Sequence, residues 1–98
     1  RDMTEIEAYE YVIQLYPKCG LKTVAVFGMD ITPYLKHGFR DVQYQPTHGE
    51  FDCMVAIDSE VNTRLLKNNG ILITPDIVTG HVIIQIHEGK LNAYKLKL

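Results

Sequence analysis

Three short, continuous apolar segments constrain the fold of this chain more than any other feature of its sequence. Residues 23–28 read TVAVFG, residues 51–57 read FDCMVAI and residues 71–74 read ILIT. Continuous rather than alternating apolar residues are typical of strands that are covered on both faces, as in a parallel sheet. All three are far shorter than the roughly 20 residues needed to span a bilayer. We therefore expect three buried strands of one sheet and no membrane partner.

Helical patterns stand before and between these segments. Residues 4–16 combine apolar residues at spacings of three and four with a capping box, whose partners are Thr4 and Glu7. This pattern predicts an amphipathic helix with acidic residues in its first turns, where the helix dipole favours them. A short helix is expected at residues 30–36, and a longer one at residues 60–68.

The remaining segments resemble strands. Residues 81–87 and residues 91–98 flank the tripeptide EGK, which predicts a β-hairpin at the end of the chain. Residues 41–45 alternate between polar and apolar side chains. The five residues that join them to residues 51–57 suit an antiparallel turn better than a parallel crossover. Residues 41–45 are therefore expected either as a short edge segment or as an antiparallel partner of residues 51–57.

The order of these elements predicts an α/β protein. Buried strands that alternate with helices indicate a mostly parallel sheet, and the terminal hairpin adds an antiparallel edge. The 98 residues are enough for one domain, which we expect to span residues 1–98. The formal net charge of −2 gives no reason to expect nucleic acid as a partner.

Cysteine and histidine usage bears on the cellular compartment and on metal binding. Cys19 and Cys53 could form one disulfide at most, and no disulfide framework is visible. No basic, apolar leader with a small-residue cleavage site is visible either. The expectation is a reduced, cytoplasmic protein. The four histidines are scattered along the chain and predict no metal site.

The candidate ligand site follows from a general rule for α/β sheets. Ligands bind beyond the carboxyl ends of the parallel strands, which here points to residues 27–30, 43–45 and 58–60. Asp30 and Asp58 would each stand at such a strand end, where a carboxylate can accept a hydrogen bond from a ribose hydroxyl or an amine. Either residue is explained equally well as a helix cap.

Several motifs are similar to those of Rossmann-like methyltransferases that depend on S-adenosylmethionine. The capped first helix, the turn KCG at residues 18–20 and the strand that follows resemble the beginning of that family's domain. The segment FDCMVAID at residues 51–58 looks like its fourth strand. The segment LLKNNGILI at residues 65–73 looks like the end of a helix followed by its fifth strand.

The resemblance implies a small three-layer Rossmann-like domain, with a mostly parallel sheet, helices on both faces and a C-terminal antiparallel β-hairpin. It also implies S-adenosylmethionine as the cofactor and methyl transfer to an acceptor as the activity. The residues implied in cofactor binding stand at the predicted carboxyl ends of strands: Phe27, Gly28, Met29, Asp30, Gln43, Asp58 and Ser59. No catalytic residue is predicted.

The chain also departs from the family pattern. The family's first loop is rich in glycine, whereas here Gly28 is followed by the bulky Met29. Gln43 stands where the family usually has an acid that holds the ribose, and an amide lacks the charge assistance of a carboxylate. A third strand with its preceding helix is missing.

A non-catalytic module is the alternative function. Val82, Ile83, Ile84 and Ile86 lie close together in the predicted hairpin and could extend a sheet across a two-fold axis, giving a homodimer through this hairpin. Three lysines of the hairpin, which are Lys90, Lys95 and Lys97, are expected to protect an edge strand.

Overall fold

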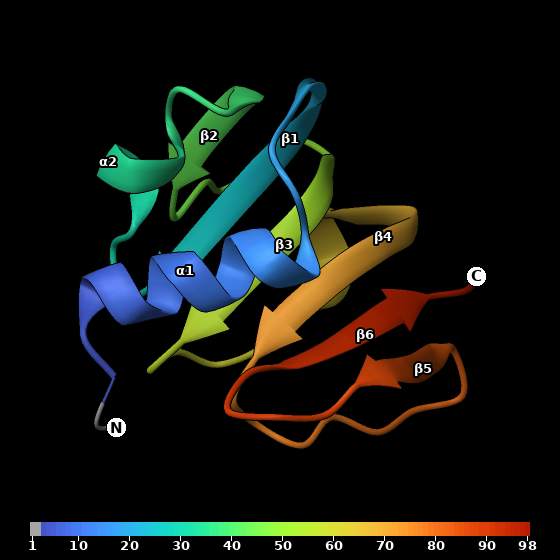
Figure 1. Ribbon diagram of the computed structural model, residues 1–98. Coiled ribbons are helices and arrows are strands. Elements are labelled where there is room, and N and C mark those ends of the chain that lie inside the picture. Colours follow the sequence, from blue (N-terminus) through green and yellow to red (C-terminus); the bar gives the residue numbers. More distant parts are fainter. Residues whose placement is uncertain (1–2) are drawn as a thin grey trace.

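The computed structural model describes residues 3–98 and contains a six-stranded sheet with the strand order β2-β1-β3-β4-β6-β5 (Figure 1). The strands are β1 (Cys19–Gly28), β2 (Phe39–Tyr44), β3 (Phe51–Ile57), β4 (Leu66–Thr74), β5 (Ile83–His87) and β6 (Asn92–Leu96). The helical elements are α1 (Glu5–Leu15), the single turn α2 (Thr32–Leu35) and the 3-10 turn η1 (Thr63–Leu65).

The sheet is mixed. Strands β2, β1, β3 and β4 are parallel neighbours, whereas β6 runs antiparallel to β4 and β5 runs antiparallel to β6. The three apolar segments of the sequence therefore form adjacent strands in the middle of the sheet. The expected C-terminal hairpin is present as β5 and β6.

Strand β2 is a parallel edge strand and not an antiparallel partner of β3. Tyr44, at its end, lies opposite Val26 of β1, whereas Cys53 of β3 lies opposite Val24. Val26 also lies opposite Val55 of β3, so the end of β2 is level with Val55. The chain must therefore return only from the level of Val55 to Phe51, which is about four residues of strand or roughly 13 Å. The six residues between Tyr44 and Phe51 are enough to cover this distance and to cross over β1. The crossover is therefore shorter than a full strand length.

The capping box at the start of α1 is confirmed. The backbone N–H of Thr4 donates to Oε1 of Glu7 at 2.9 Å, and the N–H of Glu7 donates to Oγ1 of Thr4 at 3.1 Å. These bonds satisfy donors that the first helical turn leaves without partners. The hydrogen bonds to Thr4 also lower the pKa of Glu7.

Both α-helices of the described chain cover the same face of the sheet. Ala8 and Val12 of α1, together with Leu35 of α2, belong to one core cluster with Val26 of β1 and Val55 of β3. Figure 1 shows α1 crossing this face, with α2 beside it. The opposite face has a separate core cluster and a different cover.

Loops rather than helices cover that opposite face. Residues 58–65, between β3 and β4, contribute Val61 and Leu65 to its core cluster, and residues 75–82, between β4 and β5, contribute Val78. The expected three-layer Rossmann-like arrangement with helices on both faces is therefore wrong. The two α-helices of residues 3–98, of 11 and four residues, lie on one side of a mixed sheet.

The helix expected at residues 60–68 is absent. These residues form an extended segment, the turn η1 and the start of β4. Asn69, with a φ of 68°, lies where the register between β3 and β4 shifts, so Asn69 and Gly70 form an irregularity inside a strand rather than a helix end. Leu65 and Leu66, only 6% and 5% exposed, pack on the sheet instead of on a helix face. This long-range burial outweighs the local helix signal.

Strand β6, which carries Lys95, is not an edge strand. It lies between β4 and β5, and Lys95 pairs with Ile71 on one side and Ile84 on the other. The actual edge is β5, whose sequence IIQIH contains no lysine. The expected lysine-protected edge is therefore wrong at Lys95.

Candidate functional site

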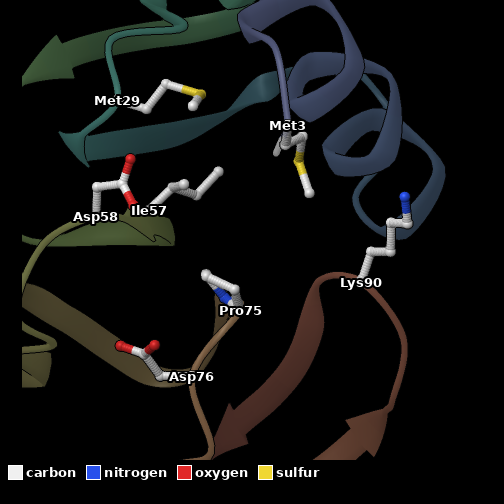
Figure 2. A pocket seen from close by; sticks show the side chains of 7 residues that line it. All are labelled: Met3, Met29, Ile57, Asp58, Pro75, Asp76 and Lys90. Atoms are coloured by element: carbon white, nitrogen blue, oxygen red, sulfur yellow. The ribbon is translucent and has the colours of Figure 1, made fainter. Parts of the chain in front are cut away.

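A hollow of about 400 Å³ lies at the carboxyl ends of β1, β3 and β4 (Figure 2). Its lining comes from five separate parts of the chain, so no single motif encodes it. The lining residues are Met3, Met29, Ile57, Asp58, Pro75, Asp76 and Lys90. The place agrees with the rule that ligands of α/β sheets bind beyond the carboxyl ends of the strands.

Two backbones approach closely beside Met29 and Ile57, which both line this pocket. Gly28 has a φ of +83°, and a Cβ atom at this position would lie 1.9 Å from the carbonyl oxygen of Ile57. The N–H of Met29 donates to that same oxygen at 2.8 Å. Only glycine fits at this contact, since it has no Cβ atom and adopts positive φ without strain. The ends of β1 and β3 are thereby held together next to the pocket.

Three neighbouring strands end at a residue whose backbone has a positive φ, in the left-handed region. Gln45 after β2 has a φ of 50°, Gly28 in β1 one of 83° and Asp58 after β3 one of 59°. The Gly28 N–H donates to Oε1 of Gln45 at 3.3 Å, and the hydroxyl of Tyr44 donates to the carbonyl oxygen of Gly28. Non-glycine residues in this region carry strain, and such residues cluster at functional sites.

The opposite wall is organised by the buried side chain of Asn92, which is 5% exposed. Its Nδ2 donates to the carbonyl oxygens of Pro75 at 3.4 Å and Asp76 at 3.2 Å. Its Oδ1 accepts from the N–H of Gly89 at 3.1 Å. The hydroxyl of Tyr94 also donates to the carbonyl oxygen of Asp76, at 3.0 Å. The loop after β4 and the β5–β6 turn, which carries Lys90, are thus tied to one buried amide.

The charges of the pocket are separated in space. Figure 2 shows Asp58 and Asp76 on one side and Lys90 across the pocket from them. Ile57 and Pro75 lie between them, and Met29 and Met3 line the upper side of the pocket in this view. This arrangement can hold an apolar body together with groups of opposite charge.

Of the seven residues implied in cofactor binding, Met29 and Asp58 line the pocket. Gly28 precedes the lining residue Met29, and Ser59 lies beside Gly28, with its Cβ 2.9 Å from where a Cβ on Gly28 would stand. No helix begins directly after Asp58, and the 3-10 turn η1 that follows at Thr63 is capped by Asn62, so Asp58 is not a helix cap.

The other three implied residues lie elsewhere. Phe27 packs against the core cluster of the loop-covered face. Asp30 accepts from the N–H of Thr32 at 3.0 Å and from its hydroxyl at 2.6 Å, so it holds the start of α2. Gln43 is on the edge strand β2, where its side-chain amide nitrogen Nε2 donates to the carboxylate of Asp41 at 2.7 Å.

Sequence reasoning missed five lining residues: Met3, Ile57, Pro75, Asp76 and Lys90. A signal existed for Pro75 and Asp76, since they follow the third apolar segment and stand at a strand end as Asp58 does. No local signal could have found Lys90, because only the folding of the hairpin beside β4 brings it to the pocket.

A second hollow, of about 300 Å³, lies near the amino ends of β1 and β3, and its lining includes Lys22, Lys67, Lys95 and Asp52. Asp52 accepts from the N–H and hydroxyl of Thr23, at 2.9 and 3.1 Å, and from Nζ of Lys67 at 3.3 Å. Partial burial raises the pKa of Asp52, but the hydrogen bonds from Thr23 and Lys67 outweigh it and leave the pKa below its ordinary value. These bonds tie three strands together.

The chain matches no known family model, no curated protein and no solved structure. Within residues 3–98, no three histidine, cysteine, aspartate or glutamate side chains gather in a group that could hold a metal ion. The helices of this part of the chain are too short or too polar to cross a membrane.

Proposed function

We propose that the pocket at the carboxyl ends of β1, β3 and β4 binds an adenosyl ligand such as S-adenosylmethionine. The observation that carries the proposal is a hollow of about 400 Å³ with Asp58 at its wall, next to the close contact of Gly28 with Ile57. Small-molecule sites are typically concave, mostly apolar and about 300–1,000 Å³ in volume.

The lining offers groups that suit the parts of such a ligand. Met29, Ile57 and Pro75 present apolar surface for a base or a thioether. Asp58 and Asp76 present carboxylates that can accept from ribose hydroxyls or an amine. Methyl transfer to an acceptor would extend the proposal. Transfer from a sulfonium depends on in-line positioning more than on a strong base, and we assign no catalytic residue.

Thermal unfolding with and without S-adenosylhomocysteine tests the binding proposal. A ligand at about 100 times its Kd adds roughly 2.7 kcal/mol to stability, which raises the Tm of a domain of this size by about 10 °C or more. Asp58→Asn should reduce this shift, and asparagine tolerates the left-handed backbone at this position. Asp41→Asn, on the exposed edge strand β2, is the matched control. Parent protein whose Tm does not move at millimolar ligand would rule the adenosyl proposal out.

Self-association through the C-terminal hairpin is the second candidate function. Ile84 and Ile86 of the edge strand β5 are 49% and 53% exposed, and within residues 3–98 β5 pairs only with β6. Ile84→Lys should shift a dimer to monomer in sedimentation velocity, whereas Leu21→Lys, at another exposed apolar position, should not. A monomeric parent at high concentration would exclude this candidate. A cytoplasmic location also remains a proposal, which the free thiols of Cys19 and Cys53 support.

A further inference from the structure

The second hollow, near the amino ends of β1 and β3, points to a ligand of its own. We propose that it binds the phosphate group of a small phosphate monoester, at the opposite end of the strands from the adenosyl pocket. Among residues 3–98, its lining combines three lysines, Lys22 of β1, Lys67 of β4 and Lys95 of β6, with a single aspartate, Asp52. Its volume of about 300 Å³ is at the lower limit for small-molecule sites, which favours a small ester.

The pairing of the strands places Lys22 and Lys95 on the helix-covered face of the sheet. Val24 of β1 pairs with Cys53 of β3, and both belong to the core cluster of that face. Ile71 of β4 pairs with Cys53 and, on its other side, with Lys95. Because side chains alternate along a strand, Lys22, two residues before Val24, belongs to this face as well. Three strand spacings, about 14 Å, separate β1 from β6, and the flexible four-carbon stems of the two lysines allow both ammonium groups to approach one anion between them.

The acceptor atoms of the polar side chains in this hollow are already used. Both oxygens of Asp52 accept hydrogen bonds from protein donors. Oδ1 of Asn68 accepts from the backbone N–H of Leu98 at 2.8 Å. Oδ1 of Asn69 accepts from Nζ of Lys97 at 3.0 Å. A ligand that donates hydrogen bonds therefore finds few acceptors here.

Five side chains of the hollow, by contrast, keep donors that bond to no other described residue. Nζ of Lys22 and of Lys95 forms no hydrogen bond or ion pair within residues 3–98, and Nδ2 of Asn68 and of Asn69 is likewise unbonded there. The hydroxyl of Tyr16, the C-cap of α1, also lacks such a bond, and burial raises its pKa, so it stays protonated. A surplus of donors selects a ligand that only accepts, and a phosphate group presents three acceptor oxygens and about −1.5 to −2 charges near pH 7.

The backbone of β4 is irregular where it lines the hollow. In a regular strand consecutive side chains alternate between the two faces, whereas residues 67–71 all line this one hollow. Asn69 has a left-handed φ of 68°, and the register between β3 and β4 shifts at this point. A Cβ atom on Gly70 would lie 2.7 Å from the carbonyl oxygen of Lys67, so no side chain fits there. Bulges and non-glycine residues with positive φ are both enriched at functional sites.

Nuclear magnetic resonance titration of the isotope-labelled protein tests the site with glycerol 3-phosphate, and glycerol is the uncharged control. At constant ionic strength the ester should shift the backbone amides of residues 67–70 saturably, and glycerol should shift none. Lys22→Gln and Lys95→Gln should each weaken binding about fivefold or more, whereas Lys36→Gln, at an exposed lysine after α2, should not. Asp52→Asn should tighten binding, because it removes the carboxylate that competes for Lys67, and a structural defect does not tighten binding.

Four outcomes would overturn the proposal. These are shifts spread over the lysines of the whole chain, parent-like affinity of both Lys22→Gln and Lys95→Gln, no saturable shift at millimolar ester, and sedimentation with vesicles that contain phosphatidic acid by a protein that does not bind glycerol 3-phosphate. An unchanged Tm of the two lysine variants without ligand verifies that they are folded. Asp58→Asn, in the adenosyl pocket, should leave the affinity for glycerol 3-phosphate unchanged, so the two sites are confirmed or refuted separately.

Discussion

Replacement of Gly28 by alanine tests the backbone contact on which the pocket depends. The Cβ atom of an alanine here would stand 1.9 Å from the carbonyl oxygen of Ile57 and 2.9 Å from Cβ of Ser59. Since two backbones meet at this point, no side-chain rotation can relieve the overlap. The ends of β1 and β3 must separate.

The expected loss of stability follows from three contributions. An alanine with left-handed φ costs roughly 1–2 kcal/mol. Separation of the strand ends breaks the 2.8 Å hydrogen bond from Met29 to Ile57, which is worth about 1 kcal/mol. The reduced freedom of the unfolded chain returns about 0.5–1 kcal/mol. We expect Gly28→Ala to lower the free energy of unfolding by about 2 kcal/mol, which lowers the Tm by roughly 10 °C.

Urea unfolding followed by far-ultraviolet circular dichroism measures this difference. Gly20→Ala is the matched control, because Gly20 lies in the same strand and a Cβ there would meet no heavy atom within 4 Å. The control should unfold like the parent or at slightly higher urea. If the free energies of unfolding of the two variants agree within about 0.5 kcal/mol, the close approach of β1 and β3 is refuted.

Two further predictions concern Asp52 and the cysteines. Because the pKa of Asp52 is lowered in the folded protein, its charge stabilises the fold above its ordinary pKa, and this contribution is lost as the pH falls. Asp52→Asn should therefore have a free energy of unfolding about 2 kcal/mol below that of the parent near pH 6. Urea titrations at a series of pH values should show this difference closing below about pH 4. A difference that does not change with pH contradicts this reasoning. Burial raises the pKa of Cys53, whereas Cys19 is partly exposed. A thiol reagent should modify Cys19 in the native protein and Cys53 only in denaturant, and equal rates at both would show that β3 is not buried.

The local patterns of the sequence predict individual elements well. The capping box of Thr4 and Glu7 places the start of α1, because its hydrogen bonds join residues three positions apart. The continuous apolar segments predict the three central strands, because a strand covered on both faces admits few polar residues. The hairpin β5–β6 follows from the turn at Gly89 and the strand patterns beside it.

Predictions that needed long-range information were less successful. The segment LLKNNG suggests a helix end by its composition, yet Leu65 and Leu66 are buried against the sheet and Asn69 forms an irregularity in β4. Nothing local to residues 60–68 specifies that a strand partner is available. The prediction of helices on the second face of the sheet was wrong for this reason.

The sequence by itself determined where most strands form, where α1 begins and that Asp58 stands at a strand end. Only the tertiary structure decided that Asp58, Asp76 and Lys90 surround one pocket. These residues come from loops after β3 and β4 and from the β5–β6 turn, and their meeting depends on strand order and on the buried amide of Asn92. Hydrogen bonds and periodicity along a segment are readable from that segment. The alignment of strands depends on burial and pairing across the whole sheet, and no single segment contains it.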